Sequence, residues 1–445
     1  MKKEKASGVA SLPVLNTLAA GVDVGSEKMH VSIAGGEPRV FETFTIGLVS
    51  LRDHLREQGV TSVALEATGV YWLPLYELLE EAQMEVVVVN GRHVKNLPGR
   101  KTDMQDCQWL ATLHAHGLLR GGFVPSLAIR RLRDYQRLRQ DHLEMGAAHI
   151  QHMQKALERM NVKVHDVISQ LNGVSGQRVV RAILAGERDP ERLAELCDGT
   201  ILNKKRDRLI ESLRGTWQPE HLFALRQALG GWEFYQEQVR QCDVEIAREL
   251  RELAGALPPE PPPEGPVRAK KLVANAPQIA DLHQLLRRIC GGQDLGRLPT
   301  LTNYTVLQIL SEVGPDLKRW PTHKHFISWL GLAPGSHQSG KRHKAVCHGV
   351  GRAGRLFCVV ARTLGKSKHL ALTGFYRRIR ATRGGQVAVK ASARKVAILF
   401  YLTLTKGLKF VEEGLAKYDE RFRQQHLHRL QRAARKMGLL LVPNA

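Results

Sequence analysis

Four acidic residues near the start of the chain have the types and the spacing of a metal site: Asp23, Glu66, Asp103 and Asp106. Asp23 precedes the alternating run 29–33, a pattern that predicts a hairpin of two short strands with Asp23 facing out beside the turn. Glu66 ends the β-rich run 60–65. Its side chain should therefore project from the carboxyl end of a strand, where open α/β sheets hold ligands.

Asp103 and Asp106 follow in a segment that predicts a helix, with Thr102 as its N-cap. Residues three apart share one helix face, so two like charges would meet in the first turn. The helix dipole stabilises each carboxylate by only about 0.3–1 kcal/mol. A bound cation would offset the remaining repulsion between the two. Carboxylate oxygens suit Mg²⁺ or Mn²⁺. Any one of the four could be a solvated or capping acid, but all four in this order favour a metal centre and phosphodiester chemistry.

The elements that must hold these side chains alternate between strand and helix. A helical stretch at 73–82 and a buried type of strand at 86–89 separate Glu66 from the Asp pair. This order, a strand Asp, a strand-end Glu and then Thr-Asp-x-x-Asp on a helix, resembles the N-terminal domain of the IS110-type transposases. The matching segments are 21–34, 64–72 and 90–111. The resemblance implies an α/β, RNase H/RuvC-like nuclease domain in which the four carboxylates form a DEDD tetrad.

Length and composition agree with a multidomain protein that handles nucleic acid. The 445 residues, 43% of them hydrophobic, can bury two or three cores. The sequence has no run of eighteen apolar residues and no signal-peptide pattern after Met1, so we expect neither secretion nor a membrane span. Six scattered cysteines without a C-x-x-C motif argue against zinc and against a disulfide framework. The expected location is the cytoplasm, in association with the nucleoid.

The positive charge is concentrated in the last third of the chain. Residues 318–445 hold 27 Lys and Arg against four acids, an excess equal to the whole net charge of +23. Residues 318–411 contain no Asp or Glu. A soluble basic surface normally mixes both signs, whereas binding of a polyanion explains the absence of acids. DNA, RNA or both are the expected partners.

The middle of the chain predicts helices. Residues 128–164 predict one long helix whose apolar residues recur at alternate steps of three and four. This pattern fits a coiled coil between chains, weakened by Gly146, and fits a helical hairpin within the chain equally well. The resemblance, whose members oligomerise through this region, favours the coil and a homo-oligomer (dimer or tetramer).

A proline-rich run divides the helical region from the basic region. It cannot form a helix or a central strand, and it predicts a stiff extended linker. The expected domains are 1–125 (α/β, with the tetrad), 126–257 (helical or coiled-coil), 258–267 (linker) and 268–445 (mostly α-helical and basic).

A second chemical candidate lies in residues 330–341, which are punctuated by glycines and predict a loop. A serine in such a loop is usually a turn former. The segment is similar, however, to the Gly-Leu-x-Pro…Ser-Gly segment of the IS110-type transposases, whose C-terminal domain supplies a serine nucleophile. Alignment on Gly331 and Leu332 and on the Ser-Gly pair favours Ser339 over Ser336.

Eight basic residues are candidates to hold phosphates without reading bases. They are Lys101, Lys341, Arg342, Lys344, Arg352, Arg355, Arg394 and Lys395. The last four lie in segments that also resemble the family's tail, 351–356 and a helix expected at 388–404. One segment departs from the resemblance: family members carry a Pro-Gly-Ile-Gly-like turn that grips a DNA phosphate, but residues 298–304 contain no glycine. The amphipathic helix expected after it, 306–313, is retained.

These features predict a transposase or site-specific recombinase of an insertion sequence, which cuts DNA with a metal-binding tetrad and rejoins it through a phosphoserine ester of Ser339. The resemblance alone implies guidance by a structured RNA from the element's noncoding end.

Three other functions fit part of the pattern. A metal-dependent RuvC-like junction nuclease would use the carboxylates and not Ser339. An actin-like ATP-dependent kinase would use the Asp-x-Gly-Ser turn at Asp23, but it gives the basic region no role. A non-catalytic nucleic-acid-binding protein would leave the carboxylates structural.

Overall fold

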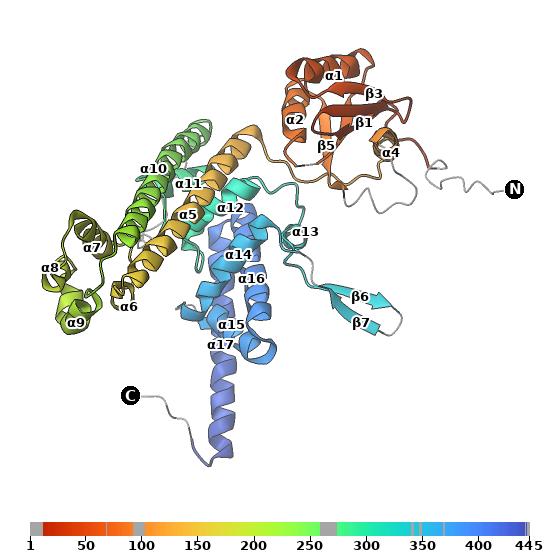
Figure 1. The fold of residues 1–445 in the computed structure, drawn as a ribbon. Helices are drawn as coiled ribbons and strands as arrows, with labels where there is room; N and C mark the ends of the chain where they lie inside the picture. Colours follow the sequence, from red (N-terminus) through yellow and green to blue (C-terminus); the bar gives the residue numbers. More distant parts are fainter. Residues whose placement is uncertain are drawn as a thin grey trace. The chain divides into compact units, whose positions relative to one another are not determined.

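The structure, a computed structural model, describes residues 12–67, 69–91, 103–258, 274–339, 342–346, 349–367, 370–440 and 442. Its contacts divide the chain into two compact units, Met1–Val124 and Pro125–Ala445 (Figure 1). No helix within the described ranges is long and apolar enough to cross a membrane.

The first unit consists of a five-stranded sheet and the helices that cover it. Its elements are β1 Ala19–Val24, β2 Lys28–Ile33, β3 Arg39–Glu42, α1 Thr45–Glu57, β4 Ser62–Glu66, α2 Trp72–Glu81, β5 Glu85–Val89 and α4 Asp103–Ala115. The strand order is β3-β2-β1-β4-β5. The first three strands form an antiparallel meander, whereas β4 and β5 run parallel to β1. The predicted hairpin around Asp23 is therefore confirmed.

Alternation along the strands divides the buried side chains between two faces of this sheet. Val22 and Leu65 belong to a core that includes Leu51 of α1 and Leu75 of α2. Ala64, on the opposite face, packs in a second cluster with residues of α4. The fold is the predicted α/β, RNase H-like arrangement followed by helices.

The second unit is helical except for one β-ribbon. Its elements are α5 Leu127–Arg159, α6 Val164–Val167, α7 Val174–Ala185, α8 Pro190–Glu195, α9 Gly199–Ser212, α10 Pro219–Gly255, α11 Leu282–Ile289, η1 Leu295–Arg297, α12 Asn303–Val313, α13 His323–Trp329, β6 Gly335–Ser339, β7 Arg342–Val346, α14 Arg352–Arg362, η2 Thr363–Lys366, α15 Leu370–Arg383, α16 Gly385–Lys406 and α17 Leu408–Lys436. The helices expected at 306–313 and 388–404 correspond to α12 and α16. The prediction of a loop at 330–341 is wrong for residues 335–339, which form the strand β6 and pair antiparallel with β7.

The long helix α5 packs along α10 of the same chain (Figure 1). Their antiparallel order follows from two contacts, Arg139 with Asp243 and His149 with Gly231. The seam residues buried in the core beside α10 include Met153, Leu157 and Met160. The hairpin within the chain is thus the alternative that the structure shows. A coiled coil between chains through this seam would require α5 to leave α10.

The expected linker at 258–267 falls, apart from Pro258, outside the described residues. Helices from both sides of it belong to one unit, with α5 bound to α12 through Arg137 and Glu312. Arg137 donates from Nε and Nη2 to the two carboxylate oxygens of Glu312, at 3.0 and 2.8 Å. The helical region and the basic region, expected as separate domains, therefore form a single unit.

A buried arginine connects the elements of this unit. Arg139, 1% exposed, donates from Nε to Oδ1 of Asp243 at 2.6 Å and from Nη1 to the hydroxyl of Tyr304 at 3.0 Å. Its Nη2 donates to the carbonyl of Asn275 at 2.9 Å. The amide of Gln278 donates to the other oxygen of Asp243. One guanidinium thus ties α5 to α10, to α12 and to the segment before α11.

Replacing Arg139 by Met should lower the free energy of unfolding of the second unit by about 3–5 kcal/mol, because Asp243 would remain buried without its cation. Denaturant titration followed by tryptophan fluorescence measures this loss. Arg240→Met, which breaks an exposed pair with Glu237, is the control and should cost no more than about 1 kcal/mol. The double variant Arg139→Met/Asp243→Leu should recover part of the loss, and equal effects for Arg139→Met and Arg240→Met would contradict this role.

Candidate functional site

Two of the predicted metal ligands lie side by side on neighbouring strands. The parallel register of β1 and β4 pairs Gly21 with Ala64 and Val22 with Leu65, so the next step places Asp23 beside Glu66. Adjacent strands are about 4.8 Å apart. Asp23 and Glu66 share a sheet face with Gly21 and Ala64, two residues before them. That face is covered by α4, because Ala64 packs with Leu110 of that helix.

The third carboxylate reaches this site on α4, which crosses β1 at Gly21. A Cβ on Gly21 would collide with the backbone of α4 at Cys107 and Ala111, so only glycine allows this close approach. Burial, with smaller contributions from the carboxylates of Asp23 and Asp106, raises the pKa of the Cys107 thiol to about 11. The two carboxylates therefore act on one side chain of α4 from a strand and from the first turn of the helix.

Glu66 is 8% exposed, and its carboxylate lies against the end of β5. A Cβ on Gly91 would collide with Oε1 of Glu66, so glycine provides the space that this carboxylate occupies. Asp103 is the first residue of α4, one turn from Asp106, although its side chain lies outside the described part. Thr102, the expected N-cap, and Lys101 also fall outside it. Among the described side chains, Asp23 and Glu66 thus lie on the sheet face that α4 covers, and Asp106 lies in the first turn of α4.

Sequence reasoning located these acids but not what surrounds them. Asp23 was expected to face out beside a turn, and it is instead half-buried on the face that α4 covers. Gly21 and Gly91 were not identified as site residues. The signal for the first was a glycine inside a strand pattern, which often marks a close backbone approach.

The candidate nucleophile belongs to the second unit. Ser339 is the last residue of β6 and Ser336 is the second, and each has a partner in β7, Arg342 and Ala345 respectively. Their side chains lie outside the described part, as do those of Arg342 and Lys344. Lys341 is not described at all.

Four of the predicted phosphate-binding residues lie on α14 and α16. Arg352 and Arg355 are exposed on α14, and the half-buried Arg394 has an Nε without a hydrogen-bond partner among the described residues. Lys395 is exposed on α16, with its ammonium 5.6 Å from the ring centre of Phe375 and 5.7 Å from that of Tyr418. These contacts hold α15, α16 and α17 together.

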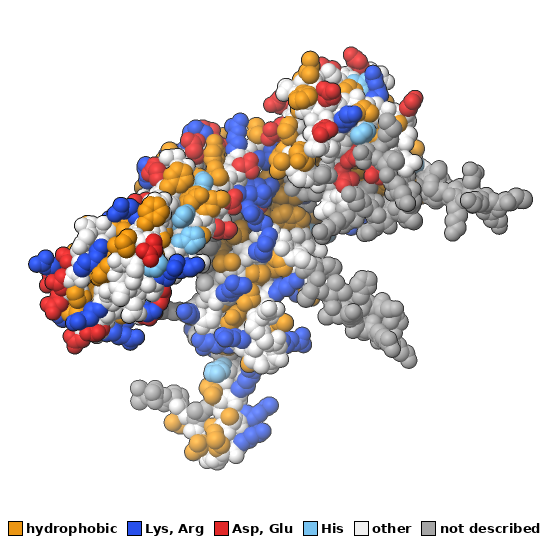
Figure 2. Space-filling view, in the orientation of Figure 1, with side chains coloured by type: hydrophobic (Ala, Val, Ile, Leu, Met, Phe, Trp, Pro, Cys, Tyr) orange, Lys and Arg blue, Asp and Glu red, His pale blue; other side chains and the backbone are white. Residues whose placement is uncertain are grey.

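Two further cations lie where α14 and α16 meet. Burial raises the pKa of Cys358, and Lys390 of α16 and Arg362 of α14 partly oppose that shift, so both cations lie close to this thiol. On the face shown in Figure 2, blue side chains over α14 and α15 are not interleaved with red ones. α14 and α15 both belong to the segment 318–411, which contains no Asp or Glu.

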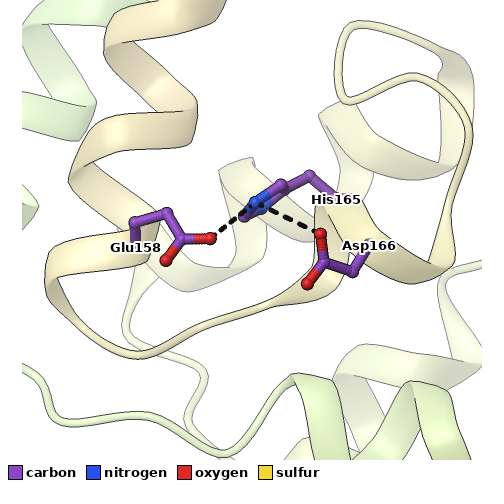
Figure 3. A group of neighbouring side chains, drawn as sticks. All are labelled: Glu158, His165 and Asp166. Carbon is purple, nitrogen blue, oxygen red and sulfur yellow. Dashed lines mark ion pairs between the residues drawn. The ribbon is translucent and has the colours of Figure 1, made fainter.

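A different group of side chains meets the geometric requirement for a metal ion. Glu158, His165 and Asp166 point toward one another (Figure 3), with ligand atoms within 4.8 Å. Nε2 of His165 lies 2.7 Å from Oε1 of Glu158. Glu158 also accepts a hydrogen bond from Lys163, which lowers its pKa. A lysine ammonium already neutralises this carboxylate. We therefore interpret the group as ion pairs that connect the end of α5 to the segment after it, and not as a metal centre.

Comparison with known proteins assigns both parts of the chain to the same kind of enzyme. Residues 20–162 match the family model DEDD_Tnp_IS110, described as a transposase, and residues 293–377 match the model of the transposase IS116/IS110/IS902 family. The first match spans all four candidate ligands, and the second spans Ser336 and Ser339. A search of curated proteins found no match. The chain belongs to the IS110 family of transposases, enzymes that cleave DNA and transfer its strands.

Proposed function

We propose that the chain is the recombinase of an insertion sequence, in which Asp23, Glu66, Asp103 and Asp106 bind Mg²⁺ or Mn²⁺ and Ser339 attacks DNA. The observation that carries this proposal is the register that puts Asp23 beside Glu66 under α4, with Asp106 in the first turn of that helix. DEDD transposase domains generally use divalent metal ions. DNA follows as the substrate from the family.

The donor set fits a hard divalent cation. Carboxylate oxygens are the ligands that Mg²⁺ and Mn²⁺ prefer, and three described carboxylates come from the neighbouring strands β1 and β4 and from the first turn of α4, which packs on them. When bound, the ion would stabilise negative charge that develops on the attacked phosphate. The residues of the chain hold the ligand oxygens in place: Asp23 and Glu66 through the rigid sheet, and Asp103 and Asp106 through the first turn of α4, where the helix dipole favours negative charge.

Ser339 would conserve the energy of the phosphodiester bond. Its Oγ would form a bond to phosphorus as the bridging P–O bond of the DNA breaks; the serine hydroxyl loses one proton, and the departing DNA oxygen takes up one to become a hydroxyl. A hydroxyl of another strand then attacks the phosphoserine ester and releases the serine. Because Ser339 and the carboxylates belong to different units, the reaction requires the two to meet. We propose that they do so in a homo-oligomer, a dimer or tetramer.

Basic residues around these groups would position the nucleic acid. Arg352, Arg355 and Arg394 lie in a segment without carboxylates, which supports contacts to phosphates rather than to bases. Lys395, held over two aromatic rings, would contribute at the edge of the same surface, and Lys101, Lys341, Arg342 and Lys344 would act near the reacting groups. A structured guide RNA encoded beside the gene is the second proposed partner.

A metal-dependent junction nuclease is the alternative function, and it is consistent with the same carboxylates. It would cut DNA with water as the nucleophile, and it would form no covalent intermediate. The gathering of Asp23, Glu66 and Asp106 favours neither function over the other, so the distinction depends on the serine.

Reconstitution tests the proposed function. The protein is purified from cells that carry its native flanking DNA, the RNA that stays bound is sequenced, and strand exchange is measured with that RNA, Mg²⁺ and the flanking DNA. We expect one discrete structured RNA and exchange that requires it. Exchange without RNA would contradict guidance but support the recombinase. Metal-dependent cleavage with neither exchange nor a covalent adduct would favour the junction nuclease.

A further inference from the structure

An open groove runs between α5 and α10 of the second unit, and none of the candidate catalytic residues is among those that line it. It has a volume of about 580 Å³. Its floor consists of small residues, with Ala156 on α5 facing Ala224, Ala228 and Gly231 on α10. A Cβ at Gly231 would collide with the ring of His149, so glycine lets this ring lie against the α10 backbone. The groove exists because the helices carry small side chains where they face each other.

Five of the residues that line the groove are basic or can become cationic. Lys155 and Arg159 are exposed on α5, together with His152, while His149 and the buried His221 lie deeper. Figure 2 shows histidine side chains gathered along the α5–α10 pair. The described residues that line the groove include no carboxylate. The adjacent Glu158 is engaged with Lys163 and His165 instead.

The side chains that line the groove favour an anionic ligand. Nδ1 of His149 is buried and has no hydrogen-bond partner among the described residues, and the ring of His149 lies 5.8 Å from that of His152. Neighbouring imidazoles alone would also suit a transition metal. The cationic side chains of Lys155 and Arg159 would repel a metal ion at the same place, whereas lysine and arginine side chains in general donate hydrogen bonds to phosphate oxygens.

We propose that the groove between α5 and α10 binds the phosphodiester backbone of a nucleic acid through Lys155, Arg159 and the imidazoles of His149, His152 and His221. Lys155 and Arg159 are one helical turn apart, about 6 Å, a spacing that suits successive phosphates of a strand better than one small anion. The contact would anchor the strand without reading its sequence. The proposal rests on the proposed function only in that the ligand is a nucleic acid.

Binding of fluorescently labelled duplex DNA and of labelled structured RNA to the full chain tests this site. The dissociation constant is measured by anisotropy at several salt concentrations for the wild type and for Lys155→Ala/Arg159→Ala. Each lost phosphate contact removes about 0.9 from the salt slope for duplex DNA and about 0.7 for single strands. We expect the double variant to lose between about one and two units of slope and to bind about tenfold more weakly. The nucleic acid that shows this change is the occupant of the groove.

Two further variants make the test specific. Lys204→Ala/Arg226→Ala removes the same charge from exposed positions outside the groove and should weaken binding by no more than about twofold. Ala224→Asp puts a carboxylate into the groove without removing any contact, and it should weaken binding as Lys155→Ala/Arg159→Ala does. Equal salt slopes for the groove variant and the control variant with both ligands would overturn the proposal. Strand exchange, measured separately in the reconstitution, would be unaffected by that result.

Discussion

Replacement of Glu66 by Gln should reduce the rate of metal-dependent DNA cleavage about a thousandfold, which corresponds to about 4 kcal/mol of transition-state stabilisation. The amide has nearly the shape of the carboxylate, so it fits over Gly91, but it lacks the negative charge that binds a divalent cation. Affinity for DNA should stay the same, because the proposed phosphate contacts are made by basic residues and not by Glu66. Single-turnover cleavage of labelled DNA and equilibrium binding measure the two effects separately.

The change in unfolding temperature on addition of metal provides a second measurement. Gln has nearly the shape of Glu, so in the absence of metal Glu66→Gln should unfold at about the same temperature as the wild type. A ligand that binds only the folded state raises the unfolding temperature. Mg²⁺ or Mn²⁺ should therefore stabilise the first unit of the wild type and have little effect on Glu66→Gln.

Glu81 provides the matched control for both measurements. It is an exposed carboxylate at the end of α2, in the same unit but away from α4. Glu81→Gln should cleave DNA and respond to metal as the wild type does. If Glu66→Gln behaved in the same way as Glu81→Gln, the metal site would have to lie elsewhere.

The positions of the carboxylates could be predicted because they depend on local pattern. Glu66 ends a β-rich run, so its place at the end of a strand follows from the residues next to it. Asp106 follows Asp103 by three residues, so their shared helix face also follows from local spacing. The crossing of α4 over Gly21 depends on contacts between segments more than 80 residues apart. A glycine inside a strand pattern can signal a close approach, but it does not say which segment approaches, so the burial of Asp23 was not predicted.

The long helix α5 shows a different limit of sequence reasoning. Its alternating apolar steps require a helical partner, but they are equally satisfied by α10 of the same chain and by another copy of α5. The small residue Gly146, which weakened the coiled-coil reading, packs against Tyr235 and Gln236 of α10. A glycine at a seam position was therefore evidence for close packing against that particular helix.

The ribbon of β6 and β7 was missed because glycine and serine have low strand propensity. Residues 335–339 nevertheless form a strand, because they pair with residues 342–346. The backbone hydrogen bonds of this pairing stabilise the strand despite its low intrinsic propensity. The consequence for the site is that Ser339 is held at the end of a paired strand. A nucleophile on such an element is positioned more firmly than one on a free loop.

Replacement of Ser339 by Ala should abolish the covalent protein–DNA adduct and strand exchange while leaving DNA binding unchanged. The methyl group cannot form an ester to phosphorus, so the energy of the broken P–O bond cannot be kept for rejoining. The adduct is measured on a denaturing gel with end-labelled DNA, and the loss should exceed about a thousandfold. Metal-dependent stabilisation of the first unit should persist, because the carboxylates belong to that unit.

Ser336 is the matched control, because it is the same residue type on the same strand. It is the second residue of β6, three positions before Ser339, which ends the strand. Three residues of strand span about 10 Å, so we expect a phosphate at Ser339 to be out of reach of Ser336, and Ser336→Ala should retain the adduct. Loss of the adduct in Ser336→Ala with its retention in Ser339→Ala would transfer the role to Ser336. Cleavage by both variants at the wild-type rate, with no adduct in any of the three proteins, would mean that water attacks the phosphate and that the carboxylates act as a junction nuclease.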